Sequence, residues 1–218
     1  YREAIKNLGD ISFDKKLEYW DNTIKNQVFV ICKTPMAKLI TKRTLLGYRN
    51  GKTNMHSFDD LVMQLKDKQA QFIQKVLKPS FWNLGGNGQM KFNAIVGNPP
   101  YQLQGGSGGS NDSPIYQYFV DASIMLKPNF VSIIMPARWG AAGRENLLGT
   151  FRKNMLNKYH LRKMCLYTDA RDIFNNVEIK GGICYFLSDL SYKGKCSYNY
   201  FDENSTYTDE RDFTNYDV

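Results

Sequence analysis

The sequence predicts a doubly wound α/β fold, with a mostly parallel sheet and an antiparallel hairpin at one edge. Apolar runs of strand length alternate with amphipathic helical segments along most of the chain. The run at 130–135 is apolar at adjacent as well as alternate positions, which is typical of a strand covered on both faces. The last three runs, at 161–167, 179–187 and 195–201, follow one another closely, which predicts the hairpin.

The first half of the chain supplies the expected elements in order, beginning with a strand at 28–32. Thr34 and Pro35 have the residue types of a helix N-cap and a first helical position, so a helix is expected from there to Gly47. Apolar residues at helical spacing predict a further helix over 58–77, which Pro79 ends. The remaining elements are a turn at 83–88, a strand at 92–97, a Gly- and Ser-rich loop at 102–113, a helix from 114, the strand at 130–135 and a helix over 143–157.

Composition narrows the class of protein. The chain has 218 residues and a formal net charge of +8, which suits a polyanionic partner such as nucleic acid. No apolar run approaches the roughly 20 residues of a membrane span, and no signal peptide opens the chain. Four scattered cysteines without a Cys-x-x-Cys pair favour reduced thiols in a cytoplasmic protein, and no metal site is expected.

The most informative motif is Asn98-Pro99-Pro100-Tyr101, which follows the apolar run at 94–97. In open α/β sheets ligands bind at the carboxyl ends of strands, and this motif is expected at such an end. An Asn carbonyl and a backbone carbonyl held by consecutive prolines would form a rigid pair of acceptors for an amino group. The tyrosine offers a ring against which a base turned out of a duplex can stack. A proline-rich turn with Tyr101 as a lid on the core is the alternative.

Residues 91–102 resemble the catalytic motif of adenine-specific DNA methyltransferases, which use S-adenosyl-L-methionine. The surrounding sequence is most similar to the methylase portion of fused type II restriction–modification enzymes. The resemblance implies a Rossmann-like methyltransferase fold that acts on double-stranded DNA as the modification part of a restriction–modification system. It also implies that Asn98 and the Pro99 carbonyl accept from the adenine amino group while Tyr101 stacks on the extruded base. Pro100 completes the motif.

Other positions receive roles through the same resemblance. The strand ending at Pro136 resembles the family's fifth strand, and residues 173–177 resemble its last motif, where Phe174 would pack against the extruded adenine. Phe174 as core packing is an equal alternative. Asp59 and Asp60 are candidates for contacts with the cofactor, together with Asn98, although both carboxylates also suit the first turn of a helix. The loop at 105–110 would be a flap over the base.

The sequence departs from the family at the cofactor site. No glycine-rich turn of the family's type occurs before Val28, and Cys32-Lys33-Thr34 stands where the family usually has a carboxylate. The chain also begins with Tyr1 rather than Met, so we expect a piece of a longer protein that is inactive alone. The expected parts are a helical lead-in over 1–27, a partial methyltransferase domain over 28–190, and the start of a further segment over 191–218 that could serve target recognition.

Basic side chains are expected to contact DNA, with Arg138, Arg144 and Arg171 as the leading candidates. A solvated basic helix face is the simpler explanation for several others. Two alternative functions remain open. One is a methyltransferase for glutamine side chains or for guanine in RNA, since both use similar Asn-Pro-Pro-aromatic motifs. The other is an inactive methyltransferase-like module that binds DNA, which the absent glycine-rich turn favours.

Overall fold

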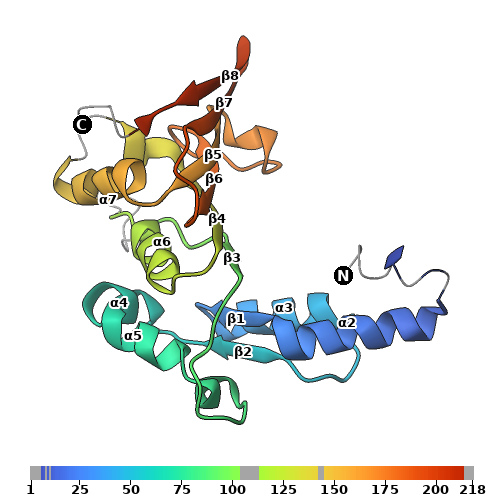
Figure 1. The fold of residues 1–218 in the computed structure, drawn as a ribbon. Helices are drawn as coiled ribbons and strands as arrows, with labels where there is room; N and C mark the ends of the chain where they lie inside the picture. The colour runs from blue at the N-terminus through green and yellow to red at the C-terminus, as the bar shows by residue number, and fades with distance from the viewer. Residues whose placement is uncertain (1–5, 8, 10, 104–112, 142–144, 214–218) are drawn as a thin grey trace. The chain divides into compact units, whose positions relative to one another are not determined.

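The computed structural model describes residues 6–7, 9, 11–103, 113–141 and 145–213. The chain divides into two compact units, an N-terminal unit over Tyr1–Met90 and a C-terminal unit over Lys91–Val218 (Figure 1). This boundary splits the single domain expected over 28–190. The expected class is confirmed, because the structure is a mixed α/β Rossmann-like fold, but its strands form two separate sheets rather than one.

The N-terminal unit is built around a parallel pair of strands. Thr34 caps the helix α3 (Pro35–Leu46) as expected, since the Thr34 hydroxyl accepts from the Ala37 amide at 3.1 Å. Gly47 ends that helix in the left-handed conformation with φ 55°. The elements are α2 (Phe13–Gln27), β1 (Phe29–Cys32), α3 (Pro35–Leu46), β2 (Asn54–Ser57), α4 (Leu61–Asp67), α5 (Gln69–Val76) and η1 (Pro79–Trp82).

Two features of this unit differ from the sequence prediction. The helix expected over 58–77 is broken into α4 and α5, because Lys68 has non-helical angles of φ −134° and ψ 32°. Strand β2 was not expected, since its composition is largely polar. The Asn54 side-chain amide explains its place, because it donates to the carbonyls of Lys25 (2.7 Å) and Val28 (3.1 Å) at the end of α2.

The C-terminal unit contains a six-stranded sheet in the order β3-β4-β6-β5-β7-β8. Its elements are β3 (Ala94–Gly97), α6 (Tyr116–Met125), β4 (Phe130–Pro136), η2 (Ala137–Gly140), α7 (Glu145–Asn157), β5 (Leu161–Tyr167), η3 (Ala170–Asp172), β6 (Ile183–Asp189), β7 (Cys196–Asp202) and β8 (Ser205–Arg211). Strands β3, β4, β5 and β7 run in one direction and β6 and β8 in the other. The carboxyl ends of the four parallel strands therefore lie along one edge of the sheet.

Helices α6 and α7 lie together on one side of this sheet in Figure 1. The core of the unit forms between them and the strands, where apolar side chains of both helices pack on alternate residues of β4 and β6. Its most buried members include Val120, Val131, Met135, Met155 and Phe186. Such alternation is expected where one sheet face carries the core. In the part of the chain that the structure describes, no helix combines the length and apolar character needed to cross a membrane.

The end of the chain also departs from the prediction. Strand β7 pairs in parallel with β5, and β8 pairs with β7 as an antiparallel hairpin at the sheet edge. Strands β7 and β8, which lie in the segment expected over 191–218, are therefore part of the six-stranded sheet. Strand β6 begins at Ile183 rather than at 179. Strand β8 escaped prediction because its seven residues, Ser205–Arg211, are mostly polar and six of them are exposed.

Candidate functional site

The Asn98-Pro99-Pro100-Tyr101 motif directly follows β3, at the carboxyl edge of the six-stranded sheet. Asn98 is exposed, whereas Pro99 is buried and Pro100 half-buried. Within the described residues, neither the Asn98 side chain nor the Pro99 carbonyl takes part in a hydrogen bond. Two polar groups at the end of a strand are thus available to a ligand, one flexible and one fixed by the proline rings.

Tyr101 is half-buried with its hydroxyl turned inward. Its Oη is buried and has no hydrogen-bond partner among the described residues. Burial, with a contribution from the nearby Cys184 thiol, raises the pKa of Tyr101 to about 12. The Cys184 Sγ itself accepts a hydrogen bond from the Trp139 Nε1 at 3.3 Å. The hydroxyl end of the ring therefore faces the protein interior near Cys184 of β6, which leaves the solvent-accessible remainder as the part that could meet a base.

A short antiparallel ladder holds the residues that follow the motif. Gln102 forms a bridge with Pro114, the Ile115 amide donates to the Tyr101 carbonyl at 3.1 Å, and the Leu103 amide donates to the Ser113 carbonyl at 3.3 Å. The ladder brings the two ends of the Gly- and Ser-rich segment together. The flap expected at 105–110 lies outside the described residues.

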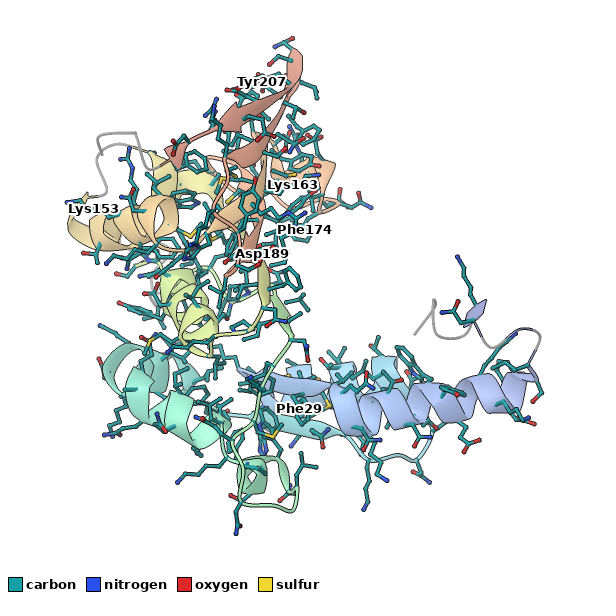
Figure 2. All side chains as sticks on the ribbon, in the orientation of Figure 1. Phe29, Lys153, Lys163, Phe174, Asp189 and Tyr207 are labelled. Carbon is teal, nitrogen blue, oxygen red and sulfur yellow. The ribbon has the colours of Figure 1, made fainter. Side chains whose placement is uncertain are left out.

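Phe174 lies in the loop that follows β5, at the same edge of the sheet, and is labelled in Figure 2. It is half-buried, its amide donates to the Ala170 carbonyl at 2.8 Å, and its ring contacts no aromatic ring of the described residues. Strands β4 and β6 lie between β3 and β5, a separation of about 14 Å at the usual strand spacing. Asn98 and Phe174 thus follow strands that lie three strand spacings apart along one edge of the sheet.

Glycines fix the far end of the loop after β5. Gly182 has φ +76°, and a Cβ there would lie 2.2 Å from the Tyr167 carbonyl oxygen. Its own carbonyl accepts from the Ala137 amide at 3.1 Å, which ties the loop to the residue after β4. Only glycine fits this approach.

Comparison with known proteins assigns the chain to a family. The model of the Eco57I restriction-modification methylase family matches residues 26–174, which is more than half of the chain and includes the motif after β3. The chain belongs to the Eco57I restriction-modification methylase family. An uncharacterized adenine-specific methylase of Mycoplasma pneumoniae (strain M129) is 40% identical over 114 residues, which are 51% of this chain and 27% of that protein.

The fold of this chain is similar to the folds of solved restriction–modification proteins. A modification subunit assigned to a type I restriction enzyme from Vibrio vulnificus YJ016 superposes with a TM-score of 0.55 at 12% identity, over 91% of this chain and 40% of that one. A cryoEM structure of a DrdV–DNA complex superposes with a TM-score of 0.51 at 11% identity, over 91% of this chain and 25% of that one. At these identities the likeness concerns the fold alone. The chain spans about a quarter of the methylase relative and 25–40% of these structures.

The arginines expected to contact DNA differ in their surroundings. Arg138, in η2 of this methylase chain, is half-buried and has no carboxylate partner within the described ranges. A Cβ on Gly181 would lie 2.6 Å from the Arg138 Cγ, so the glycine makes room for the arginine stem. Arg171 instead pairs with Asp169, with 2.8 Å between its Nε and Oδ2, and this pairing lowers the pKa of the Asp169 carboxyl. Arg144 lies outside the described residues.

The carboxylates expected at the cofactor site follow β2 in the N-terminal unit. Asp60 precedes α4, and its Oδ1 accepts from the Gln64 Nε2 at 2.7 Å. Asp59 is exposed and has no partner in the described part of the chain. At the end of the neighbouring β1, Thr34 is engaged in capping and Cys32 is buried. The Asp59 carboxylate, which no described residue occupies, fits a contact with a nucleoside cofactor. The end of β1 offers no second carboxylate for that cofactor.

Sequence reasoning missed the aromatic surroundings of these carboxylates. The centroid of the His56 ring lies 4.2 Å from that of Phe81 and 5.3 Å from that of Trp82. The Lys75 ammonium lies 4.9 Å from the centroid of the Phe58 ring. Burial lowers the pKa of His56. The five residues come from β2 and the loop after it, from α5 and from η1, so no local pattern could have predicted the whole cluster.

Proposed function

We propose that this chain carries the target-base site and part of the cofactor site of an adenine-specific DNA methyltransferase. The acceptor pair of Asn98 and the Pro99 carbonyl, free at the carboxyl end of β3, is the observation that carries the proposal. The name of the Mycoplasma relative favours adenine over the glutamine or guanine alternatives, and the DNA complex among the similar folds favours duplex DNA. The protein would act in the cytoplasm as the modification part of a restriction–modification system, in which a nuclease could be fused.

The chemistry follows from the amino group of adenine, whose nitrogen lone pair is delocalised into the ring. Acceptors aimed at both amino hydrogens favour electron density on the nitrogen and so raise its nucleophilicity. The Asn98 side-chain oxygen and the Pro99 carbonyl would supply them, and Pro100 would keep the second one rigid. S-adenosyl-L-methionine would supply the methyl group when bound.

Aromatic rings would hold the base that leaves the duplex. The Tyr101 ring, anchored by its buried hydroxyl end, and the half-buried Phe174 ring offer two faces along the same sheet edge. Stacking on such a ring contributes about 1–3 kcal/mol per base, which offsets a flipping cost of a few kcal/mol. Stacking on both rings would compensate for the free energy that is lost when the target base unpairs and unstacks.

For the cofactor, Asp59 is the better of the two expected carboxylates, since Asp60 already accepts from Gln64. The Asp59 carboxylate would accept from a hydroxyl or amino hydrogen of the adenosine part, and Asn98 would stand beside the reacting methyl group. Asp60 would orient the start of α4. For DNA, the free Arg138 is the best candidate for a phosphate contact, and Arg171 would act together with Asp169. Residues 191–218 would aid target recognition through the hairpin of β7 and β8 at the edge of the sheet.

The first test introduces Asn98→Ala into the full-length protein. Methyl transfer to adenine should fall to background, while the Kd for duplex DNA changes little, because the side chain acts on an amino group and not on phosphates. Asn93→Ala is the matched control, since Asn93 is an exposed asparagine just before the same strand. A parallel loss of binding and turnover in Asn98→Ala would make Asn98 structural and the proposal wrong.

The second test concerns the DNA partner. Arg138→Ala should reduce the slope of log K against log salt by about 1, as the loss of one phosphate contact does. Arg162→Ala is the control, since Arg162 pairs with Asp189 (3.1 Å) at the amino-terminal end of β5, away from the motif edge. Equal slopes for wild type and Arg138→Ala would remove Arg138 from the DNA interface.

A further inference from the structure

Gln117, in the first turn of α6, is a buried amide that the proposed function does not use. The residue is 6% exposed, its Nε2 donates to the Pro114 carbonyl at 2.9 Å, and its Oε1 has no partner among the described residues. Leaving a buried acceptor unpaired is unfavourable, so an apolar side chain would suit this position better if packing alone mattered. The amide must therefore contribute through the group that it does bind.

That group belongs to the ladder beside the Asn-Pro-Pro-Tyr motif. Pro114 has no amide hydrogen, so its carbonyl is its only backbone group for a hydrogen bond, and Gln117 occupies it. Pro114 lies opposite Gln102, and the next amide, of Ile115, donates to the Tyr101 carbonyl at 3.1 Å. A single side chain thus fixes the segment that faces the backbone of Tyr101.

We propose that Gln117 is a positioning residue for base stacking: by holding the Pro114 carbonyl it keeps the Tyr101 ring in the orientation that receives the target base. This role rests on the proposed function. Gln117 makes no contact with the base itself. Its loss would let the 113–115 segment shift, and the Tyr101 backbone with it, while the buried hydroxyl end of Tyr101 stays in place. The ring would then tilt relative to the acceptors on Asn98 and Pro99.

The test compares Gln117→Leu with wild type in methylation of duplex DNA. We expect kcat to fall about tenfold, the effect of one buried hydrogen bond, with KM for DNA unchanged. The melting temperature should fall by no more than the loss of one hydrogen bond explains, because the substitution removes the unpaired Oε1 but leaves the Pro114 carbonyl without its donor. Ser123→Ala is the matched control, since Ser123 is a buried polar residue of the same helix that donates only to the Phe119 carbonyl. It should alter stability without altering kcat.

A double-mutant cycle with Tyr101→Ala separates positioning from general damage. If Gln117 acts through the ring, Gln117→Leu should cost less than threefold once the ring is absent, compared with about tenfold when it is present. A rescue follows from Gln117→Glu, whose carboxyl can donate to the Pro114 carbonyl only when protonated. Its activity relative to wild type should therefore rise as the pH falls.

The following results would contradict the positioning role proposed for Gln117. Additive effects of Gln117→Leu and Tyr101→Ala would show that Gln117 does not act through Tyr101. A kcat loss that tracks the melting temperature, or a flat pH profile for Gln117→Glu, would make the residue merely structural. A wild-type protein that methylates no adenine would overturn the proposed function itself, whereas normal wild-type methylation with an additive cycle would overturn the role of Gln117 alone.

Discussion

Substitution of Tyr101 separates the ring from the hydroxyl. Because Oη is buried without a partner, Tyr101→Phe removes an unsatisfied polar group and should not destabilise the protein. An unpaired buried hydroxyl costs about 1–3 kcal/mol, which is the upper limit of the expected gain. For a unit of this size each kcal/mol would raise the melting temperature by about 3–6 °C. Methyl transfer by the Phe variant should equal that of wild type.

Tyr101→Ala removes the ring face as well. A stacking contribution of about 1–3 kcal/mol corresponds to a fall of about 5- to 150-fold in methyl transfer, and Tyr101→Trp should retain most of the activity. The assay uses a duplex with the target adenine opposite thymine and the same duplex with the adenine opposite a gap. The Ala variant should recover part of its deficit on the gapped duplex, because much of the flipping cost is already absent there.

Three results would refute this account of Tyr101. A deficit of the Ala variant that is equal on both duplexes and follows thermal stability would make Tyr101 a lid on the core. A Phe variant as inactive as the Ala variant would assign the role to the hydroxyl and not to the ring. A Phe variant that melts well below wild type would show that Oη has a hydrogen-bond partner outside the described residues.

Three further predictions concern the cofactor, the loop after β5 and the aromatic cluster. The isolated 218-residue chain should bind S-adenosyl-L-methionine weakly or not at all, because residues 1–27 supply no glycine-rich turn and β1 no carboxylate; micromolar affinity by calorimetry would contradict this. Gly182→Ala should cost more than about 1 kcal/mol, since its Cβ would meet the Tyr167 carbonyl at 2.2 Å, whereas Gly140→Ala, with open space around it, should not; denaturant titration compares them. Burial lowers the pKa of His56, so protonation favours the unfolded chain: the contribution to stability is complete above about pH 6.5 and is lost as the pH falls through the lowered folded-state pKa. Thermal melts between pH 7.5 and 5.5 should show this loss in wild type and His160→Gln but not in His56→Phe.

The sequence predicted most accurately those structural features that depend on residues close together in the chain. Thr34 and Pro35 begin a helix because an N-cap oxygen and a fixed φ act within one turn. The motif after β3 was found for the same reason, since an apolar strand followed by two prolines ends at a definite residue. Strands β4 and β5 were placed within a residue, because each has apolar residues over most of its length and ends at a clear change of composition.

The misses arise from contacts between distant residues. Strand β2 exists because Asn54 bonds to the end of α2 and because β1 offers a parallel partner, neither of which appears in its own residues. Strand β8 is specified by its pairing with β7 at an exposed edge. The hydroxyl of Tyr101 is buried near Cys184, more than eighty positions away, so the motif alone suggested only a ring. Composition likewise counted Arg138 and Arg171 as equal charges, although only Arg171 has its carboxylate at hand.

The side chains proposed for the base and the carboxylate proposed for the cofactor belong to different compact units. Asn98, Tyr101 and Phe174 all stand at the carboxyl edge of the six-stranded sheet, whereas Asp59 follows the two-stranded sheet. Within the C-terminal unit, the positions proposed to contact a base depend on packed residues such as Gln117 and Gly182. These residues hold the loops at the edge of the sheet in place. We therefore expect the acceptor pair proposed for adenine to be held by the C-terminal unit alone, without the proposed cofactor carboxylates in place.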